Sequence, residues 1–523
     1  MANVSIIEGF QPKNDPVLLE KAESLKPELK VTTLTGSRMG EEKALKEGDQ
    51  VRFDFGNHQV GYVTLHLSHQ GSHPDAPAFI KLKFAERAEE MDEDSSEYEG
   101  WISRGWIQEE WLHIDQLPAE VRLPRRYAFR YIQIDVLATS LKYQLKVDRV
   151  TCEAVSAVSM EDLSEPLQTE DELLKKIDQV SIRTLMNCMQ DVFEDGPKRD
   201  RRLWIGDLRL QAKANYKTFK NYDLVKRCLY LFAGSRFPDG RVSANIFTDG
   251  EVEADDSYLA DYALFFVPLL AEYYAETKDQ EALDDLYGIA MEQIDIVMRQ
   301  VGEDGVVKDG ENGFWCFIDG DDEGDAEKEG GNGFWCFIDW NNEINKQASF
   351  QGILIYSLRY ALKLAQEKQD AKRIGMCRGA IELLVKGAKE KLFDKEEMVF
   401  VSGKARQVST ASQAWMVLAQ VFDQETNRKI LRAIREKGLP YHMATPYMMH
   451  HYCEALIQSG EKEEAMKVIK GYWGKMIEMG ADTFWETFNP EDPEESPYGG
   501  SMVNSYCHAW SCTPAYLLRE YEF

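Results

Sequence analysis

The chain has 523 residues, of which 44% are hydrophobic and 11% aromatic, the composition of a globular protein and not of a disordered one. This length is sufficient for a large core and predicts more than one domain. The 61 basic and 90 acidic residues give a net charge of −29, which argues against nucleic acid or an anionic membrane as a partner.

The N-terminal segment, the longest apolar run and the cysteines indicate where the protein is located. The N-terminal segment MANVSIIEGFQPKNDP has no positive region followed by an apolar core, so we expect no signal peptide. The longest apolar run, 263–271, contains Pro268 and is too short to span a bilayer. The nine cysteines show neither CxxC nor Cys/His clustering, which favours free thiols over disulfides or a zinc site. The sequence therefore predicts a cytoplasmic protein that does not enter a membrane.

Residues 1–158 have the pattern of a β-rich domain. The segments 51–56, 60–69, 78–86 and 130–138 alternate apolar with polar residues, which is the period of a half-buried strand. Turn-rich segments separate them, so we expect an antiparallel β-sandwich. Three tryptophans of this region, Trp101, Trp106 and Trp111, are either structural or reach a substrate cleft, and we favour the structural interpretation.

After residue 158 the pattern changes to the period of amphipathic helices. Ten or more helices of this length suit a helical barrel or a solenoid, and the absence of a repeat of 34 or 40 residues weakens the solenoid alternative. We therefore expect an all-α domain over residues 159–523. Its predicted helices lie at 171–190, 257–276, 280–300, 348–365, 373–392, 409–421, 445–458, 462–478 and 503–520.

The segment 195–207, DGPKRDRRLWIGD, concentrates charge around one large aromatic residue. Asp195, Asp200 and Asp207 alternate with four Lys and Arg residues, and a solvated surface is one explanation of this density. Trp204, however, is too large to expose without a function, and sugar rings commonly rest on such side chains. Several carboxylates beside guanidinium groups can have separated pKa values, which lets one site hold a proton donor and an acceptor.

This segment resembles the catalytic motif of the α-L-rhamnosidases, inverting glycosidases built on a six-hairpin (α/α)6 barrel. In that family an Asp is followed after five residues by the general acid and after seven more by a second Asp. Asp195, Asp200 and Asp207 have this spacing, with Arg199 and Trp204 in register. The family usually has Glu as the general acid, so Asp200 is a departure.

The resemblance continues in order along the chain. The segment NGFWCFID occurs at 312–319 and again at 332–339, and only the second copy runs into Asp339-Trp340, which resembles an Asp-Trp motif lining the sugar pocket. Trp485-Glu486 resembles a Trp-Glu motif whose Glu activates the hydrolytic water. His508, on the last predicted helix, matches a His that contacts the sugar. This colinearity is more specific than any single motif.

The resemblance implies a β-sandwich accessory domain over 1–158 and a catalytic (α/α)6 barrel over 159–523. It implies hydrolysis of a terminal α-L-rhamnosyl or similar deoxy-sugar residue with inversion. Asp200 is the expected general acid and Glu486 the expected general base, about 6.5–9.5 Å apart. No metal or organic cofactor is called for, a carbohydrate is the expected partner, and an oligomer is compatible with the sequence. The expected substrate-binding residues are Asp195, Arg199, Trp204, Asp207, Asp339, Trp340, Trp485 and His508, of which Arg199 binds a hydroxyl or a neighbouring acid.

Two alternatives stay open. The first is a non-catalytic sugar-binding relative, because Asp200 is one methylene shorter than Glu and its proton can fall short of the glycosidic oxygen. The second is another six-hairpin enzyme, such as an unsaturated glucuronyl hydrolase, which uses Asp as its acid and base. Its acidic substrate would favour a basic pocket, whereas the residues gathered here are mostly acidic.

Overall fold

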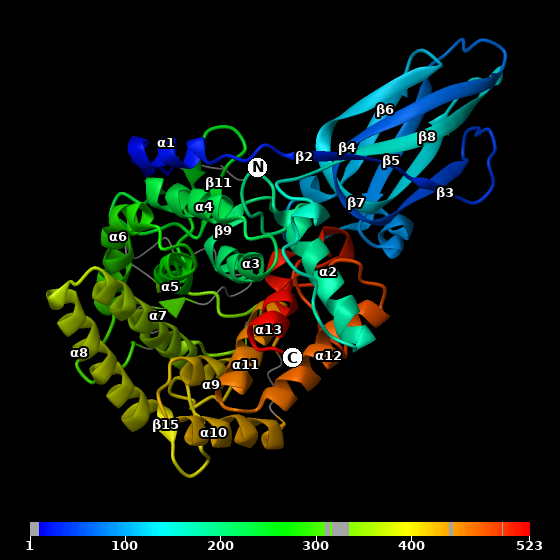
Figure 1. Cartoon of the computed structure of the whole chain (residues 1–523). Coiled ribbons are helices and arrows are strands. Elements are labelled where there is room, and N and C mark those ends of the chain that lie inside the picture. The colour runs from blue at the N-terminus through cyan, green and yellow to red at the C-terminus, as the bar shows by residue number, and fades with distance from the viewer. Residues whose placement is uncertain (1–9, 309–313, 316–333, 342, 439–442, 494) are drawn as a thin grey trace, which may run out of the picture. The chain divides into compact units, whose positions relative to one another are not determined.

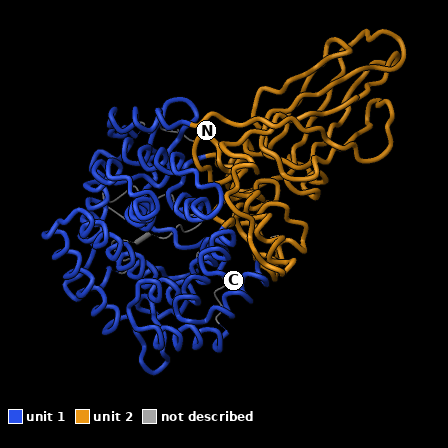
Figure 2. The backbone as a smooth tube through the Cα atoms, in the orientation of Figure 1, with its two compact units in different colours: residues 1–26, 202–472, 513–523 blue, residues 27–201, 473–512 orange. Residues whose placement is uncertain are grey.

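The computed structural model describes residues 10–308, 314–315, 334–341, 343–438, 443–493 and 495–523 (Figure 1). The chain divides into two compact units (Figure 2). Unit 1 comprises residues 1–26, 202–472 and 513–523, and unit 2 comprises residues 27–201 and 473–512. The chain passes between the units after residues 26, 201, 472 and 512. The expected domain boundary at residue 158 stays a prediction.

Unit 2 contains one seven-stranded antiparallel sheet, which confirms the predicted β-rich N-terminal region. The strand order is β2-β8-β4-β7-β5-β6, and β3 pairs with β4. The predicted strands 51–56 and 60–69 are parts of one long strand, β4, whose register shifts between Asp54 and Gln59. The strands are β2 (Lys30–Thr35), β3 (Ser37–Met39), β4 (Gln50–Gly71), β5 (Ala78–Ala85), β6 (Glu109–Ile114), β7 (Ala119–Ala138) and β8 (Tyr143–Ser156).

The alternating pattern that predicts these strands also builds the core of the sheet. In β5, Ala78, Ile80, Leu82 and Phe84 point to the same face and are at most 5% exposed. Their partners in the core come from β4, β7 and β8. Outside the sheet, unit 2 holds the helix α2 (Glu172–Cys188) and short turns that include η1 (Ala88–Asp92), η6 (Ser501–Val503) and η7 (Ala509–Ser511).

Unit 1 is helical. The helices that pack in succession are α3, α5, α7, α9 and α11, while α4, α6, α8 and α10 each pack on a member of this inner set (Figure 1). Burial follows this division, because α5 and α7 bury residues on every face whereas α8 buries three, Cys377, Leu384 and Gly387. The bounds are α1 (Pro16–Ser24), α3 (Ile205–Lys217), α4 (Tyr222–Gly234), α5 (Ala260–Thr277), α6 (Gln280–Met298), α7 (Gln347–Glu367), α8 (Ala371–Gly387), α9 (Thr410–Leu418), α10 (Gln424–Lys437), α11 (Pro446–Gln458) and α13 (Pro514–Glu520); α12 (Lys462–Glu478) crosses the boundary between the units.

Local capping explains where many of these helices begin. Side chains of Asp279, Asp370, Ser409, Asp423 and Thr445 each accept a hydrogen bond from a backbone N–H in the first turn of the helix that follows. These polar residues directly precede the helical periods, so most predicted helices agree with the structure to within a few residues. Four helices lie outside the predicted segments. They are α1, within the β-rich region of the sequence, and α3, α4 and α10 in the helical region.

The predicted helix at 503–520 is wrong. In its place the chain forms the short turns η6 and η7, and only Pro514–Glu520 is α-helical. The N–H of His508 donates to the carbonyl of Phe484 and the N–H of Ala509 to that of Asp195, so these groups are bonded to distant segments and not along a helix. Proline lacks an N–H and is tolerated in the first turn, so the helix begins at Pro514.

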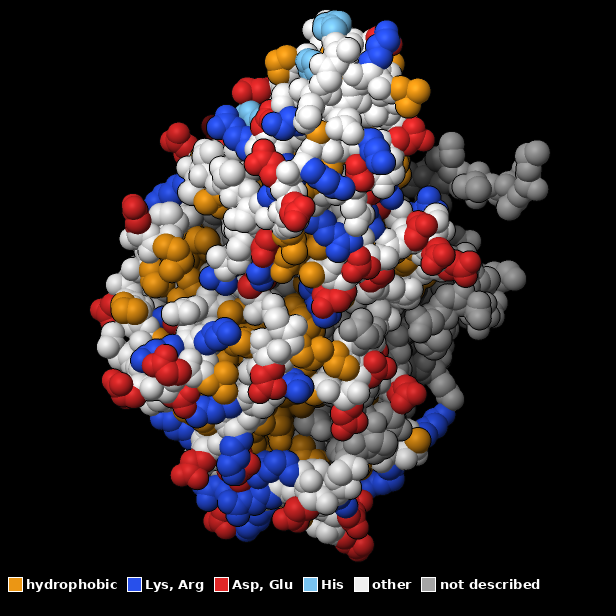
Figure 3. All heavy atoms as spheres, turned by 90° about the vertical axis from the view of Figure 1, so that its right-hand side faces the viewer, with side chains coloured by type: hydrophobic (Ala, Val, Ile, Leu, Met, Phe, Trp, Pro, Cys, Tyr) orange, Lys and Arg blue, Asp and Glu red, His pale blue; other side chains and the backbone are white. Residues whose placement is uncertain are grey.

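Three further findings bear on the sequence-based expectations. The eight cysteines among the described residues are all free thiols and all buried. No helix in the described ranges combines the length and hydropathy that crossing a membrane requires. On the face shown in Figure 3 acidic and basic side chains are interspersed, so the net negative charge is not gathered into one patch there.

Candidate active site

The ten predicted site residues fall into two groups. Asp195, Arg199, Asp200, Trp485, Glu486 and His508 belong to unit 2, and Trp204, Asp207, Asp339 and Trp340 belong to unit 1. The two expected catalytic carboxyl groups therefore lie in the same unit.

The loop after α2 carries the first three of these residues. Its fold is fixed by the N–H of Asp200, which donates to Oδ2 of Asp195 (3.1 Å), and by the N–H of Arg201, which donates to the carbonyl of Gly196 (3.0 Å). A Cβ at Gly196 would lie 2.5 Å from Oγ of Ser505 and 2.6 Å from the carbonyl of Arg199, so this position requires glycine. The Asp195 carboxylate thus positions the backbone of the residue expected to be the acid.

Arg199 bridges the two expected catalytic carboxyl groups. Its Nη2 donates to Oε2 of Glu486, and its Nη1 lies 3.4 Å from Oδ1 of Asp200. Because a guanidinium is a small planar fork, the nearest oxygens of the two carboxyl groups lie within about 8 Å of each other. Arg199 is 5% exposed, its Nε donates to the carbonyl of Val503 (3.0 Å), and its guanidinium lies 3.9 Å from the ring centroid of Tyr498. Burial lowers the pKa of Arg199, but Glu486 and the other nearby acidic groups outweigh it, so the net pKa is raised and the side chain stays charged.

Glu486 is held from several directions. Its carboxylate, 3% exposed, accepts hydrogen bonds from Arg199 and from the hydroxyl of Tyr498. Its own N–H donates to the carbonyl of Ser505 (3.0 Å), and its carbonyl accepts from Nε1 of Trp510 (2.9 Å). Such charge-assisted bonds are short and hold the carboxylate fixed in direction.

The two carboxyl groups differ in their access to solvent. The Asp200 side chain is 20% exposed, whereas that of Glu486 is 4% exposed. His508 is also near the buried member, since its Nδ1 lies 4.0 Å from Oε2 of Glu486. The two carboxyl groups on either side of the Arg199 guanidinium therefore stand in different environments, Asp200 partly open to solvent and Glu486 enclosed.

Tyr498 is a site residue that the sequence did not reveal. It lies in the segment Pro497-Tyr498-Gly499-Gly500, and its only local signal is an aromatic residue inside a glycine-rich turn. Its hydroxyl donates to Glu486 and its ring supports Arg199, so it contacts both members of the buried ion pair.

A second group of buried charges packs against the loop that follows α2. Lys198, 1% exposed, pairs with Glu90 and lies 3.7 Å from Glu86, which in turn binds Nε2 of His58 (2.8 Å) and accepts from the N–H of Tyr506 (2.7 Å). Burial and the neighbouring Glu86 raise the pKa of Glu90 to about 7, although Lys198 opposes this shift. Glu86, at the end of the predicted strand segment 78–86, therefore helps to anchor the loop that carries Asp195, Arg199 and Asp200.

Trp485 is enclosed in unit 2. It is 2% exposed, and its ring packs edge-on against Phe488 (5.4 Å) and Tyr506 (5.3 Å). The guanidinium of Arg87 covers it at 4.8 Å. These contacts fix the residue directly before Glu486.

The unit 1 group combines buried acids with aromatic rings. Asp339 accepts hydrogen bonds from Oγ1 of Thr445 (2.6 Å) and from the N–H of Ala444 (2.9 Å). Burial raises the pKa of Asp339 to about 6, although these bonds oppose it. The carboxylate of Asp261 accepts from the N–H groups of Phe337 (3.0 Å) and Ile338 (3.1 Å), so it holds the segment that carries Asp339.

Aromatic side chains surround these acids. Trp204 precedes α3 and lies edge-on to Tyr262 at 6.3 Å, while Phe337 contacts both Tyr262 (5.8 Å) and Trp340 (5.4 Å). Asp207 lies in the first turn of α3 and is 2% exposed. Burial raises the pKa of Tyr447, and the charges of Asp261, Asp207 and Asp339 raise it further, so these three acids lie near one tyrosine. Carboxylates among aromatic rings suit a ligand with hydroxyl groups and an apolar face.

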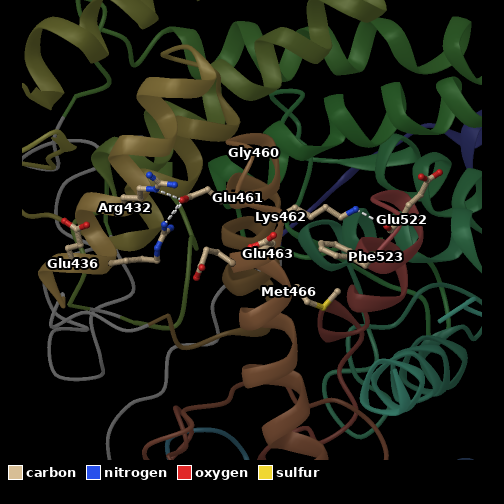
Figure 4. Close-up of a pocket in the computed structure, with 11 residues that line it drawn as sticks. Arg432, Glu436, Gly460, Glu461, Lys462, Glu463, Met466, Glu522 and Phe523 are labelled. Atoms are coloured by element: carbon tan, nitrogen blue, oxygen red, sulfur yellow. Dashed lines mark hydrogen bonds and ion pairs between the residues drawn. The ribbon is translucent and has the colours of Figure 1, made fainter. Parts of the chain in front are cut away.

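Unit 1 also has a surface pocket of about 1140 Å³ between α10 and α12 (Figure 4). Arg432 and Arg435 bind Glu461 there, and Lys462 donates to the carbonyl of Glu522. The Glu461 carboxylate in this pocket is thus paired with two guanidinium groups, and none of the predicted site residues lines the pocket. We therefore do not assign the function to this pocket.

Two family models match the chain. Residues 16–154 match a model described as the glycosyl hydrolase family 78 alpha-rhamnosidase N-terminal domain, and residues 164–521 match one described as the bacterial alpha-L-rhamnosidase 6 hairpin glycosidase domain. Among curated proteins the search found no match.

Solved structures give the same result. The chain is similar to a rhamnosidase from Klebsiella oxytoca with rhamnose bound, with 41% identity, a TM-score of 0.91, and coverage of 98% of this chain and 100% of that one. It is also similar in fold to a GH78 family rhamnosidase of Bacillus sp. GL1 (21% identity, TM-score 0.72, 92% of this chain and 47% of that one). A Streptomyces avermitilis alpha-L-rhamnosidase complexed with L-rhamnose shows a likeness of fold as well (15% identity, TM-score 0.65, 94% and 44%).

Proposed function

The chain belongs to the α-L-rhamnosidase family of glycoside hydrolases, and from this premise we propose that it hydrolyses terminal α-L-rhamnosyl or similar deoxy-sugar residues with inversion at the anomeric carbon. The family membership confirms the resemblance seen in the sequence and the assignment as a glycosidase.

We propose that the helical part is an (α/α)6 barrel over residues 159–523 and that the N-terminal sheet folds as a β-sandwich over 1–158. The inner set α3, α5, α7, α9 and α11, each packed on the next, and the outer set α4, α6, α8 and α10 support the barrel. In such a barrel the loops at one end of the inner helices form the site. Asp207 lies in the first turn of α3, and Asp339 lies in the segment that leads into α7.

The observation that carries the proposed chemistry is the bridge that Arg199 makes between Asp200 and Glu486. An inverting glycosidase needs about 6.5–9.5 Å between its two carboxyl groups, because a water must fit beside the sugar. Because one guanidinium joins both groups, their nearest oxygens lie about 8 Å apart or less. This limit overlaps the inverting window and also includes the spacing of about 5–5.5 Å of retaining enzymes, so the anomer of the product decides between the two.

Asp200 is the proposed general acid and Glu486 the proposed general base. Asp200 is the more exposed of the two, and it gives its proton to the glycosidic oxygen as the bond to the anomeric carbon breaks. Glu486, held in place by its bonds from Arg199 and Tyr498, takes a proton from the water that attacks the opposite face of that carbon. The products are the free sugar and the protonated leaving group.

The other eight residues are proposed to bind the sugar or to position the acids. In unit 2, Asp195 holds the backbone of Asp200, Arg199 binds both acids, and Trp485 and His508 flank Glu486. The remaining four supply the acids and aromatic faces of unit 1, which suit the hydroxyl groups and the methyl group of a deoxy-sugar. They are Trp204, Asp207, Asp339 and Trp340.

The test is hydrolysis of p-nitrophenyl α-L-rhamnopyranoside followed both by release of p-nitrophenol and by proton NMR. We expect the β-anomer of L-rhamnose as the first product, and we expect Asp200→Asn and Glu486→Gln to be strongly impaired. First formation of the α-anomer would refute the inverting mechanism. Binding of L-rhamnose without hydrolysis would favour the sugar-binding alternative, and turnover of an unsaturated glucuronide alone would favour the glucuronyl hydrolase.

A further inference from the structure

We propose that Trp101 is the platform for the leaving group of the substrate, and that it selects rhamnosides whose leaving group has a planar aromatic ring next to the scissile bond. The inference rests on the proposed function, because it takes Asp200 and Glu486 as the catalytic pair. All residues that carry it belong to unit 2.

Trp101 is exposed and yet held in place. It is 59% exposed, although indole is a large ring that is mostly apolar. Its Nε1 donates to the carbonyl of Pro497 (2.7 Å), which fixes the direction of the ring. The neighbouring backbone is also tightly packed, since a Cβ at Gly100 would lie 2.0 Å from the carbonyl of Tyr498. A large aromatic face is thus presented to solvent in one orientation.

This fixed ring is directly connected to the catalytic pair. Its centroid lies 5.7 Å from that of Tyr498. The Tyr498 hydroxyl donates to Glu486, and the Tyr498 ring supports Arg199, which bridges Glu486 and Asp200. Tyr498 itself is 2% exposed, so a short chain of contacts runs from the exposed Trp101 ring through buried Tyr498 to Arg199 and the two carboxyl groups.

Because Trp101 lies on the solvent side of the catalytic pair, we expect it to face the leaving group and not the sugar. Glu486 and Arg199 are buried, so the sugar ring that they serve must lie inward of the surface. The leaving group extends toward solvent, on the side of Asp200, the more exposed acid that protonates it. Trp101 packs on the Tyr498 ring, Tyr498 lies against Arg199, and Arg199 contacts Asp200. A flat apolar face on this path can stack on an aromatic leaving group, and such stacking contributes about 0.5–1.5 kcal/mol.

Trp111 offers a matched control in the same unit. It is 53% exposed, so its exposure is similar, but it lies in β6, where Nζ of Lys81 is 5.0 Å from its ring centroid. Removing either indole deletes a comparable exposed aromatic surface. The Trp101 ring packs against Tyr498, whereas the Trp111 ring packs against Lys81.

The experiment measures binding by calorimetry, so it does not depend on turnover. The two probes are 4-methylumbelliferyl 1-thio-α-L-rhamnopyranoside, which resists hydrolysis, and L-rhamnose, which lacks a leaving group. We expect Trp101→Ala to weaken binding of the aryl thioglycoside by about 3- to 10-fold and to leave binding of L-rhamnose unchanged. Trp101→Phe should retain most of the affinity, and Trp111→Ala should alter neither ligand.

Two results would overturn the inference. One is equal affinity of wild type and Trp101→Ala for the aryl thioglycoside. The other is an equal loss for both ligands, which would mean that Trp101 only supports Tyr498. If the wild type bound no L-rhamnose, the proposed function would fail together with this inference, whereas rhamnose binding without the Trp101 effect would refute the inference alone.

Discussion

Replacing Arg199 with methionine tests the central contact of the proposed site. The change keeps much of the volume of the side chain and removes its charge. Glu486 loses the Nη2 donor, Asp200 loses its bridging cation, and the carbonyl of Val503 loses a bond from Nε. The Tyr498 hydroxyl remains as a donor to Glu486.

The size of the effect follows from burial. The side chains of Arg199 and Glu486 are 6% and 4% exposed, so the variant leaves a buried carboxylate without its cation. Removing one partner of a buried pair costs about 3–5 kcal/mol, and the remaining Tyr498 bond places the loss of unfolding free energy near the lower end, about 3 kcal/mol. Activity should fall about 100-fold or more, because small displacements of catalytic groups have effects of this size.

The assay compares urea unfolding with kcat for an aryl α-L-rhamnoside. Lys81→Met is the control, since Lys81 lies 2.9 Å from Glu109, whose side chain is 5% exposed, within the sheet. We expect a loss of stability in both variants and a loss of activity per folded molecule in Arg199→Met alone. A folded Arg199→Met protein whose kcat stays within tenfold of wild type would show that the bridge does not organise the catalytic pair.

Three further predictions follow from the same contacts. Asp200→Asn should reduce hydrolysis of rhamnosides with poor leaving groups by about 10²–10⁴-fold, and it should reduce hydrolysis of activated aryl rhamnosides less. Asp200→Glu should lower kcat by misplacing the proton. An inactive wild type that gains activity with Asp200→Glu would instead favour a sugar-binding protein. Tyr498→Phe should lower kcat about 10- to 100-fold through loss of one bond to a charged group, with L-rhamnose affinity unchanged in calorimetry; equal kcat values would contradict this role. Burial raises the pKa of Asp339 from 3.8 to about 6, so the folded state binds this proton more tightly than the unfolded state, and wild type loses stability as pH rises through this window. Asp339→Asn lacks that loss, so its urea stability relative to wild type should rise by about 2 kcal/mol between pH 4 and pH 6.5, and a constant difference over this range would contradict the assignment.

Much of the fold could be predicted because its signals are local. The alternation in β5 and the helical period of α7 depend on neighbours two to four residues away, and both appear in the structure where the sequence predicts them. The segment 503–520 shows the limit of this reasoning. Its apolar spacing suits a helix, but the N–H groups of His508 and Ala509 are bonded to Phe484 and Asp195, which no local pattern reveals.

The candidate site divides in the same way. By itself the sequence determined which residue types are available and in what order, from Asp195 to His508, and this order identified the family. Only the tertiary structure decided that Arg199 joins Glu486 across 287 positions of the chain, that Tyr498 binds the same carboxylate, and that Lys198 rests on Glu86 and Glu90. The physical reason is that a buried charge is stable only with a partner, and that partner is set by packing in space and not by proximity in sequence.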